Sequence, residues 1–445
     1  MAKNIRLSDH FSYSKLLRFT LPSIVMMVFT SIYGVVDGLF VSNFVGKTAF
    51  ASVNLVMPFV MILGGMGFMT GTGGTALVSK ILGEGDPDTA NRTFSMMVLF
   101  TLALGIVLSA GGIIFMRPVS RFLGATDAMM DDCVLYGRII TGFTFAFMLQ
   151  NVFQSFFIAA EKPKLGLKVT VAAGLTNMVL DALFIAVFKW GVAGAAIATG
   201  LSQCVGGVLP LVYFLRPNSS LLRLSPTRLR LRPILAACGN GSSELMSNIS
   251  SSVVSMLYNF QLMRLAGEDG ISAYGVLMYV QFIFISIYIG YSIGCAPVVS
   301  YHFGAQNHGE LKNLLGKSVL LMGGTGVALT ALAMALADPL SRLFVGYDAG
   351  LFALTSHAFR LFAWSFLLAG FNIYTSGFFT ALNNGGVSAA ISFLRTLVFQ
   401  SASVLILPIF FDVDGIWWAI TVAEVFAFLI SVTFLLAKRG KYHYM

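Results

Sequence analysis

Residues 16–44 read LLRFTLPSIVMMVFTSIYGVVDGLFVSNF, and this stretch decides the class of fold. It is longer than the about 20 helical residues that cross a bilayer core of about 30 Å, and its charged residues are Arg18 and Asp37. It is also far longer than the apolar core of a signal peptide and lacks a convincing small-residue cleavage site. We therefore predict a retained first membrane span that carries an acid.

Eleven further apolar stretches follow, and the composition agrees with them. The chain has 445 residues, of which 57% are hydrophobic and 11% charged, and its mean hydropathy is +0.83. This excludes a soluble enzyme, a nucleic-acid binder and a disordered chain. The runs exceed 20 residues, so helices are preferred over a barrel. We predict an all-α polytopic membrane protein with twelve spans, centred near residues 31, 66, 104, 146, 177, 203, 245, 284, 324, 368, 396 and 426.

The bases of the chain set its expected orientation. Of the 28 Lys and Arg residues, 19, Lys3 among them, fall on the side of the N-terminus, 8 on the other side, and Arg395 inside a span. The positive-inside rule places both termini in the cytoplasm of a bacterium, in its inner membrane. The net charge of +9 therefore reflects topology rather than nucleic-acid binding. Four widely spaced cysteines indicate neither disulfides nor a metal site.

The two halves of the chain repeat at an offset of 221 residues. This offset relates Gly83 to Gly304, Pro118 to Pro339, Ala160 to Ala381 and Gly194 to Gly415. We predict two six-helix lobes in the same membrane orientation with a central V-shaped cavity: an N-lobe over residues 1–215, a basic cytoplasmic linker over 216–231 and a C-lobe over 232–445. Parallel repeats are typical of secondary transporters. The glycine-rich run 64–74 lacks the ending of a P-loop, so an ion gradient must drive transport.

Four acids fall within the predicted spans, where an unpaired charge is expensive: Asp37, Asp181, Glu244 and Glu424. Counted along helices from the nearest loops, Asp37, Asp181 and Thr199 lie at about the same depth. Asn177 is four residues before Asp181 and shares its helix face. Two carboxylates, an amide and a hydroxyl suit either Na⁺ or shared protons, so we predict a coupling-ion site in the N-lobe. The offset gives no such residues in the C-lobe. A satisfied hydrogen-bond network is the structural alternative.

Other polar residues within spans are weaker candidates for the substrate cavity. One set is Gln150, Asn151 and Gln154, which the offset relates to Phe371, Asn372 and Thr375. The others are Gln203, which the offset relates to Glu424, and Glu244. Arg395 either pairs with an acid or extends to the cytoplasmic interface, and we favour the interface. Pro22 interrupts the first helix 15 residues before Asp37 and is a candidate hinge, although a static kink is equally compatible.

Together these features resemble the MATE (multidrug and toxic compound extrusion) family over essentially the whole chain, in particular its DinF-like and MepA-like bacterial branch. The matching motifs are Pro22 with Asp37, TNMVLDALF at 176–184, GAAIATGLS at 194–202 and CGNGSSELMSN at 238–248. The resemblance implies twelve helices in two lobes, a rocker-switch antiport cycle, and a cation site at Asp37, Asn177, Asp181 and Thr199. The tenth span lacks the aspartate found in NorM-like members, which argues against an ion site in the C-lobe.

The sequence therefore predicts a multidrug efflux antiporter, not an enzyme, that exports amphiphilic organic cations in exchange for H⁺ or Na⁺. It predicts no cofactor besides the coupling ion, no nucleic-acid partner, surrounding membrane lipids and a monomeric state. The alternative is a flippase for a lipid-linked saccharide or another amphiphile, which needs a basic cavity. Arg395 is the plausible base within a span, and this argues against the alternative. The choice between H⁺ and Na⁺ and the identity of the substrate stay open.

Overall fold

The computed structural model describes residues 5–445, apart from the side chains of Leu39, Ser42, Asn43 and Lys47. Lys3, one of the bases used to predict the orientation, lies outside the described residues. The described chain is helical, and the α-helices and the π and 3₁₀ segments (η) are α1 (Tyr13–Phe44), α2 (Lys47–Gly83), α3 (Pro87–Phe122), α4 (Asp127–Gly142), α5 (Thr144–Ala159), α6 (Pro163–Asp181), η1 (Ala182–Val187), α7 (Gly191–Leu215), α8 (Leu231–Gly304), α9 (His308–Val345), α10 (Ala349–Phe362), η2 (Ala363–Ser365), α11 (Phe366–Ala381), α12 (Gly385–Phe393), η3 (Leu394–Phe399) and α13 (Gln400–Tyr442).

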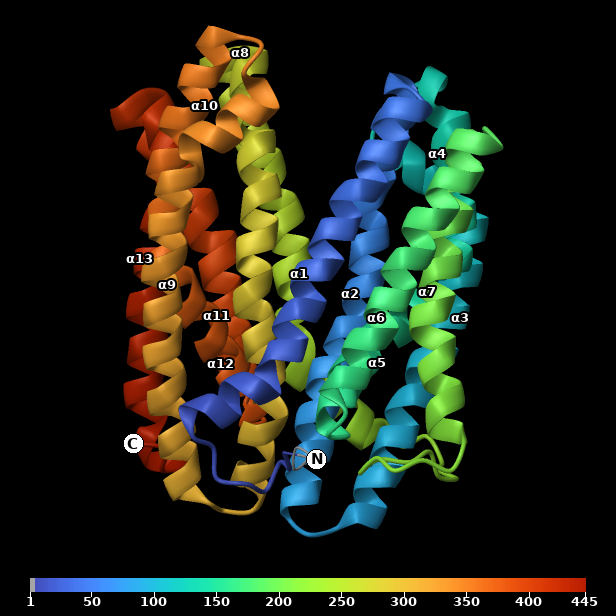
Figure 1. Ribbon diagram of the computed structural model, residues 1–445, viewed down its shortest axis with the longest axis vertical. Helices are drawn as coiled ribbons and strands as arrows, with labels where there is room; N and C mark the ends of the chain where they lie inside the picture. The colour runs from blue at the N-terminus through green and yellow to red at the C-terminus, as the bar shows by residue number, and fades with distance from the viewer. Residues whose placement is uncertain (1–4) are drawn as a thin grey trace.

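These helices form two bundles. Figure 1 shows α1–α7 in one bundle and α8–α13 in the other, with the start of α1 and the end of α13 at the bottom, where the bundles meet, and a divergence toward the top. We call the first bundle the N-lobe, the second the C-lobe, and the bottom the terminal end. The all-α fold with two lobes agrees with the prediction.

The described residues contain nine helices long and apolar enough to cross a membrane, or ten if the bent pair α4 and α5 is one span. At 1.5 Å per residue, the 74 residues of α8 would extend about 110 Å, far beyond a bilayer core, so this helix must turn back. It does so at Gly267, and α13 turns at Asp412, because both residues have positive φ. Dividing the chain at these two residues brings the count to the predicted twelve, but the exact number stays a prediction.

The internal repeat is visible in the backbone. Gly46 and Gly267, 221 residues apart, both have positive φ where one span turns into the next. Gly83 packs on the carbonyl of Tyr301, and Gly304 packs on the carbonyl of Lys80, so that a Cβ on either glycine would overlap an oxygen. Both residue pairs are again 221 apart, as expected for contacts across a pseudo-two-fold axis. The predicted match of Gly83 with Gly304 is therefore a physical contact between the lobes.

The offset is not constant, and this corrects four predicted matches, those of Gln150, Asn151, Gln154 and Ala160. Helix α9 has 38 residues where α3 has 36, and the loop that follows it is one residue shorter. The offset is therefore 222 from α4 through the start of α6, and the last residues of α5 and α11 are Ala159 and Ala381. Ala160 thus does not match Ala381, and Gln150, rather than Asn151, is the counterpart of Asn372. At Gly191 and Asp412, both with positive φ, the offset is 221 again.

The residues before α1 join the two lobes at the terminal end. The backbone N–H of Leu7 donates to Glu161 Oε1 (2.7 Å), between α5 and α6. The N–H of Phe11 donates to Glu310 Oε1 (2.9 Å) on α9, and Lys317 Nζ donates to the Phe11 carbonyl (2.6 Å). Leu7 and Phe11 are fully buried, Phe11 within the apolar core of the C-lobe. The N-terminal segment therefore ties the lobes together where they meet.

The stretch between the lobes, residues 217–230, has no helix. It runs along α3, because the N–H groups of Arg223 and Ser225 donate to the side chains of Asn91 and Ser95 at 2.7 and 2.8 Å. The predicted domain limits at residues 215, 216, 231 and 232 stay predictions.

Candidate functional site

Asp37 and Asp181 occupy different positions on their helices. Asp37 lies well inside α1, whereas Asp181 is the last residue of α6 and is followed directly by the π-helical segment η1. A π segment interrupts the regular hydrogen-bond ladder and is frequent at functional sites. No sequence signal indicates this segment, because it contains neither Gly nor Pro.

The structure brings the four residues of the predicted ion site together. The carboxyl group of Asp37 faces Asp181, Thr199 and Asn177. Asn177 Nδ2 also donates to Thr199 Oγ1 at 3.4 Å, which joins α6 to α7. Asp181 is fully buried, and Asn177 and Asp37 are 1% and 9% exposed. A single enclosed cluster thus holds side chains from α1, α6 and α7.

The oxygens of this cluster are incompletely satisfied. Both carboxyl oxygens of Asp181, Oδ1 of Asp37 and Oδ1 of Asn177 have no hydrogen-bond partner among the described residues. Two like charges about 4 Å apart repel by about 4 kcal/mol at an effective dielectric constant near 20. The two acids can therefore remain buried together only if a proton or a cation neutralises at least one of them.

The donor set consists of hard oxygen ligands, namely two carboxylates, an amide and a hydroxyl. Such ligands suit alkali and alkaline-earth cations rather than soft transition metals. No group of three or more His, Cys, Asp and Glu side chains that could hold a metal occurs within residues 5–445 as described.

Two tyrosines near the acids were missed by the sequence reasoning. Tyr136 on α4 lies close to both Asp37 and Asp181, and Tyr33 on α1 faces Gln150. Tyr33 is four residues before Asp37, so helical periodicity could have placed it on the same face. No sequence pattern links Tyr136 to the site, because it comes from a different helix.

The C-lobe holds a charged cluster of another kind. Arg395, inside η3, donates from Nε to both carboxyl oxygens of Glu424 (2.9 and 3.0 Å) and from Nη2 to Oε1 (2.6 Å). Asn372 Nδ2 donates to Oε2 at 2.7 Å. Glu424 is 1% exposed and the Arg395 side chain 17%. The expectation that Arg395 extends to the membrane interface was therefore wrong, because the buried carboxylate provides a forked partner within reach.

Most of the predicted cavity residues are enclosed within their lobes. Gln150, Asn151, Gln154, Gln203, Asn372 and Glu424 are all buried. Asn151 Nδ2 donates to the Gly64 carbonyl at 3.0 Å and so holds α5 against α2. Whether any of these residues contacts a substrate stays a prediction.

Glu244 differs from them because it lies between the lobes. It lines a pocket of about 30 Å³ whose walls include Thr72, Thr75 and Ser155 from the N-lobe and Ser292 and Thr380 from the C-lobe. One acid and several Ser and Thr residues thus line a pocket to which both lobes contribute. Glu244 is half-buried.

Pro22 lies inside α1, which continues through it without a break. The helix packs closely on α8 just beyond this residue, where a Cβ on Gly290 would meet the backbone of Ser23 and Ile24. The role of Pro22 as a hinge stays a prediction.

The fold described above defines a polytopic, all-α membrane protein built from two repeat-related lobes. The sequence model of the MatE family matches residues 22–183 and 245–403, more than half of the chain, so the chain belongs to this family. It is a membrane protein of the MATE type, similar to MepA.

Named relatives and solved structures agree with this assignment. The multidrug export protein MepA of Staphylococcus saprophyticus is 23% identical over 443 residues, with 96% of this chain and 94% of the relative covered. MepA of Staphylococcus aureus is 22% identical over 435 residues, with the same coverage. A multidrug resistance MATE family transporter of the MOP superfamily, solved in an outward-facing conformation, superposes with a TM-score of 0.93 at 21% identity over 100% of both chains.

Proposed function

We propose that this protein is an efflux antiporter that exports organic cations in exchange for H⁺ or Na⁺. The observation that carries the proposal is the buried pair Asp37 and Asp181, because Oδ1 of Asp37 and both carboxyl oxygens of Asp181 lack hydrogen-bond partners among the described residues. Coupling to a cation gradient requires a site that binds and releases a positive charge. The relatives are named as multidrug export proteins, which supports export and a non-enzymatic function.

The position of Glu244 supports a cationic substrate. Its carboxyl group and the surrounding hydroxyls lie at the bottom of the region between the lobes, where both lobes contribute to the walls. A carboxylate attracts a cation and repels an anion, and hydroxyl oxygens can accept hydrogen bonds from an ammonium group. We infer that a substrate cation taken up from the side of the terminal end is held near Glu244 and leaves through the diverging end.

We infer a rocker-switch cycle from the contacts between the lobes. The lobes diverge at one end (Figure 1), and at the other the glycine contacts and the N-terminal segment close them. Opening the terminal end while the other end closes would expose the same region alternately to each side. The distribution of bases supports placing both termini in the cytoplasm of a bacterium, so that the present state faces outward, and we expect a monomer.

The test is transport of a fluorescent organic cation in proteoliposomes with independently imposed Na⁺ and pH gradients. We expect one of the gradients to drive uphill transport, and Asp37→Asn and Asp181→Asn each to abolish the coupling. The matched control is Asp131→Asn, which changes an exposed acid on α4 of the same lobe. Transport independent of both gradients, or full coupling in the Asp37→Asn and Asp181→Asn double variant, would refute the proposal.

The flippase alternative loses support from the structure. It needs a free base within the membrane for a pyrophosphate group, and Arg395, the base that the sequence suggested, is bound by Glu424. Lipid scrambling in the same proteoliposomes would distinguish the two functions.

A further inference from the structure

The C-lobe has an apolar groove on a side that takes no part in the region between the lobes. The groove has a volume of about 460 Å³ and is lined by residues of α9, α11 and the end of α13, together with Tyr444 and Met445. Figure 1 shows α9 and α13 on the side of the C-lobe away from α1–α7. Because no lining residue comes from the N-lobe or from α8, the groove is distinct from the pocket at Glu244.

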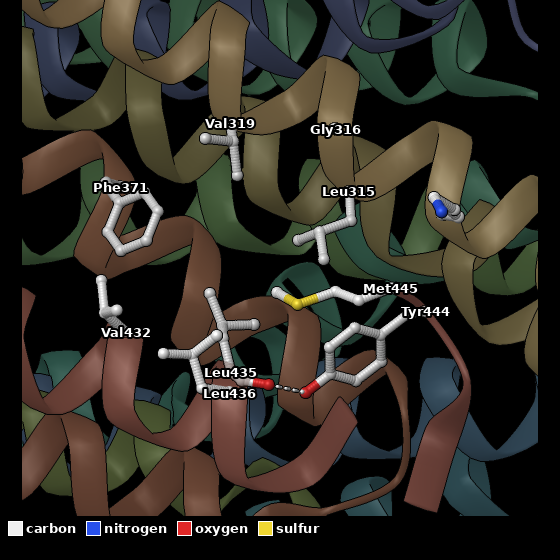
Figure 2. A pocket seen from close by; sticks show the side chains of 10 residues that line it. Leu315, Gly316, Val319, Phe371, Val432, Leu435, Leu436, Tyr444 and Met445 are labelled. Carbon is white, nitrogen blue, oxygen red and sulfur yellow. Dashed lines mark hydrogen bonds between the residues drawn. The ribbon is translucent and has the colours of Figure 1, made fainter. Parts of the chain in front are cut away.

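The groove has an apolar wall and one charged residue. Figure 2 shows Val319 of α9, Phe371 of α11, and Val432 and Leu435 of α13 around it, with Met445 beside them. The hydroxyl of Tyr444 donates to the Leu435 carbonyl at 3.0 Å, so this polar atom is satisfied within the wall. Lys312, which is exposed on the first turns of α9, also lines the groove.

Helix positions give the depth of the groove. Val319 is eleven residues after the start of α9, Phe371 ten before the end of α11, and Val432 ten before the end of α13. All three helix termini lie at the terminal end, so at 1.5 Å per residue these three residues lie about 15 Å from the ends of their helices. The 38 residues of α9 extend about 57 Å, nearly twice a hydrocarbon core of about 30 Å, so the helix projects beyond the core and Val319 lies near the boundary between headgroups and acyl chains. Lys312, four residues after the start of α9, stands at the level of the lipid headgroups.

From this geometry we infer that the groove binds an anionic phospholipid of the leaflet at the terminal end. One acyl chain lies along Val319, Phe371 and Leu435, and the phosphate group lies beside Lys312. The occupant is a lipid because the groove opens from the lipid-facing side, has an apolar wall and carries a base at headgroup level. Basic sites between membrane helices recognise anionic headgroups in this way.

Gly316 offers a clean means of blocking the groove. It lies on the groove wall and is exposed, and a Cβ added to it would meet nothing within 4 Å. Gly316→Leu should therefore fill the groove without disturbing the fold. The matched control is Gly324→Leu, two turns further along α9, where a Cβ also meets nothing within 4 Å and no groove residue is changed.

The experiment is native mass spectrometry of the full-length protein, titrated with phosphatidylglycerol or phosphatidylcholine of identical chains. We expect the native protein to prefer phosphatidylglycerol. Lys312→Gln should reduce this preference about fivefold, the equivalent of about 1 kcal/mol for one lysine near an anionic surface. Gly316→Leu should weaken binding of both lipids about tenfold, since two displaced methylenes account for a loss of that size.

Two controls make the outcomes decisive. Lys164→Gln changes an exposed lysine at the start of α6 in the other lobe, and Gly324→Leu adds the same side chain outside the groove, so neither should alter binding. Equal losses in Gly316→Leu and Gly324→Leu, or no loss in either, would overturn the groove assignment. Equal affinity of the native protein for both lipids, or a headgroup preference unchanged by Lys312→Gln, would overturn the role of the lysine. If the transported dye competes with either lipid for the groove at Gly316, the groove is a drug site and the lipid assignment is overturned.

Discussion

The ion pair between Arg395 and Glu424 leads to a quantitative prediction about stability. Arg395→Met would leave Glu424, which is 1% exposed, with Asn372 as its remaining side-chain donor. Removing one partner of a buried pair costs about 3–5 kcal/mol, because the remaining charge stays desolvated. For a chain of 445 residues, with an unfolding entropy of about 2.1 cal/mol/K per residue, this corresponds to a Tm lowered by about 3–5 °C.

The assay is thermal unfolding in detergent of the native protein, Arg395→Met, Glu424→Gln and the double variant. The double variant should recover most of the loss, because it removes both charges and leaves an amide that Asn372 can still reach. The matched control is Arg360→Met. Arg360 pairs with Asp338 at 2.7 Å, but the two side chains are 55% and 51% exposed, so the loss should be far smaller than in Arg395→Met.

Two results would refute this reasoning. One is an Arg395→Met variant as stable as Arg360→Met, which would mean that the guanidinium does not neutralise a buried charge. The other is a double variant no more stable than Arg395→Met alone, which would mean that the loss comes from packing rather than from an unpaired carboxylate.

Three further predictions concern the terminal end. Gly83→Ala should favour separation of the lobes there, because the added Cβ overlaps a carbonyl oxygen of α8. The control Gly111→Ala should not, because a Cβ at that position meets nothing within 4 Å. Spin-label distances across the terminal end measure the separation. Glu310→Ala should speed amide exchange at Phe11 about 10- to 100-fold, since a hydrogen bond to a charged acceptor contributes about 1.5–3 kcal/mol. Burial raises the pKa of Glu161 above its value near 4.5 in the unfolded chain. The contribution of Glu161 to folding stability is therefore present in full below the unfolded pKa and is lost as the pH rises through the raised pKa. Glu161→Gln should remove this pH dependence in melting curves between about pH 4 and 7.

Much of the candidate ion site was predictable because helical rise converts sequence separation into depth. Counting residues from the loops placed Asp37, Asp181 and Thr199 at about one level, and the spacing of four put Asn177 on the face of Asp181. The structure brings all four together. The coupling role of the four residues stays a prediction until transport is measured.

The C-lobe cluster was not predictable in the same way. Arg395 and Glu424 are 29 residues apart on different helices, and depth does not decide whether a long side chain turns inward or toward the interface. The buried carboxylate decides it, because three hydrogen bonds to Glu424 are available there. The fixed offset also failed to identify Gln150 as the counterpart of Asn372. The reason is that α9 is longer than its counterpart α3 and the loop after it is shorter.

The sequence by itself determined the membrane class, the two-fold repeat and the level at which intramembrane charge collects, since each of these follows from composition or from distance along a helix. Only the tertiary structure decided which charges meet a partner, how the N-terminal segment joins the lobes and where an apolar groove remains open. Those features depend on how helices rotate and pack against one another, and that rotation is set by contacts between residues far apart in the chain.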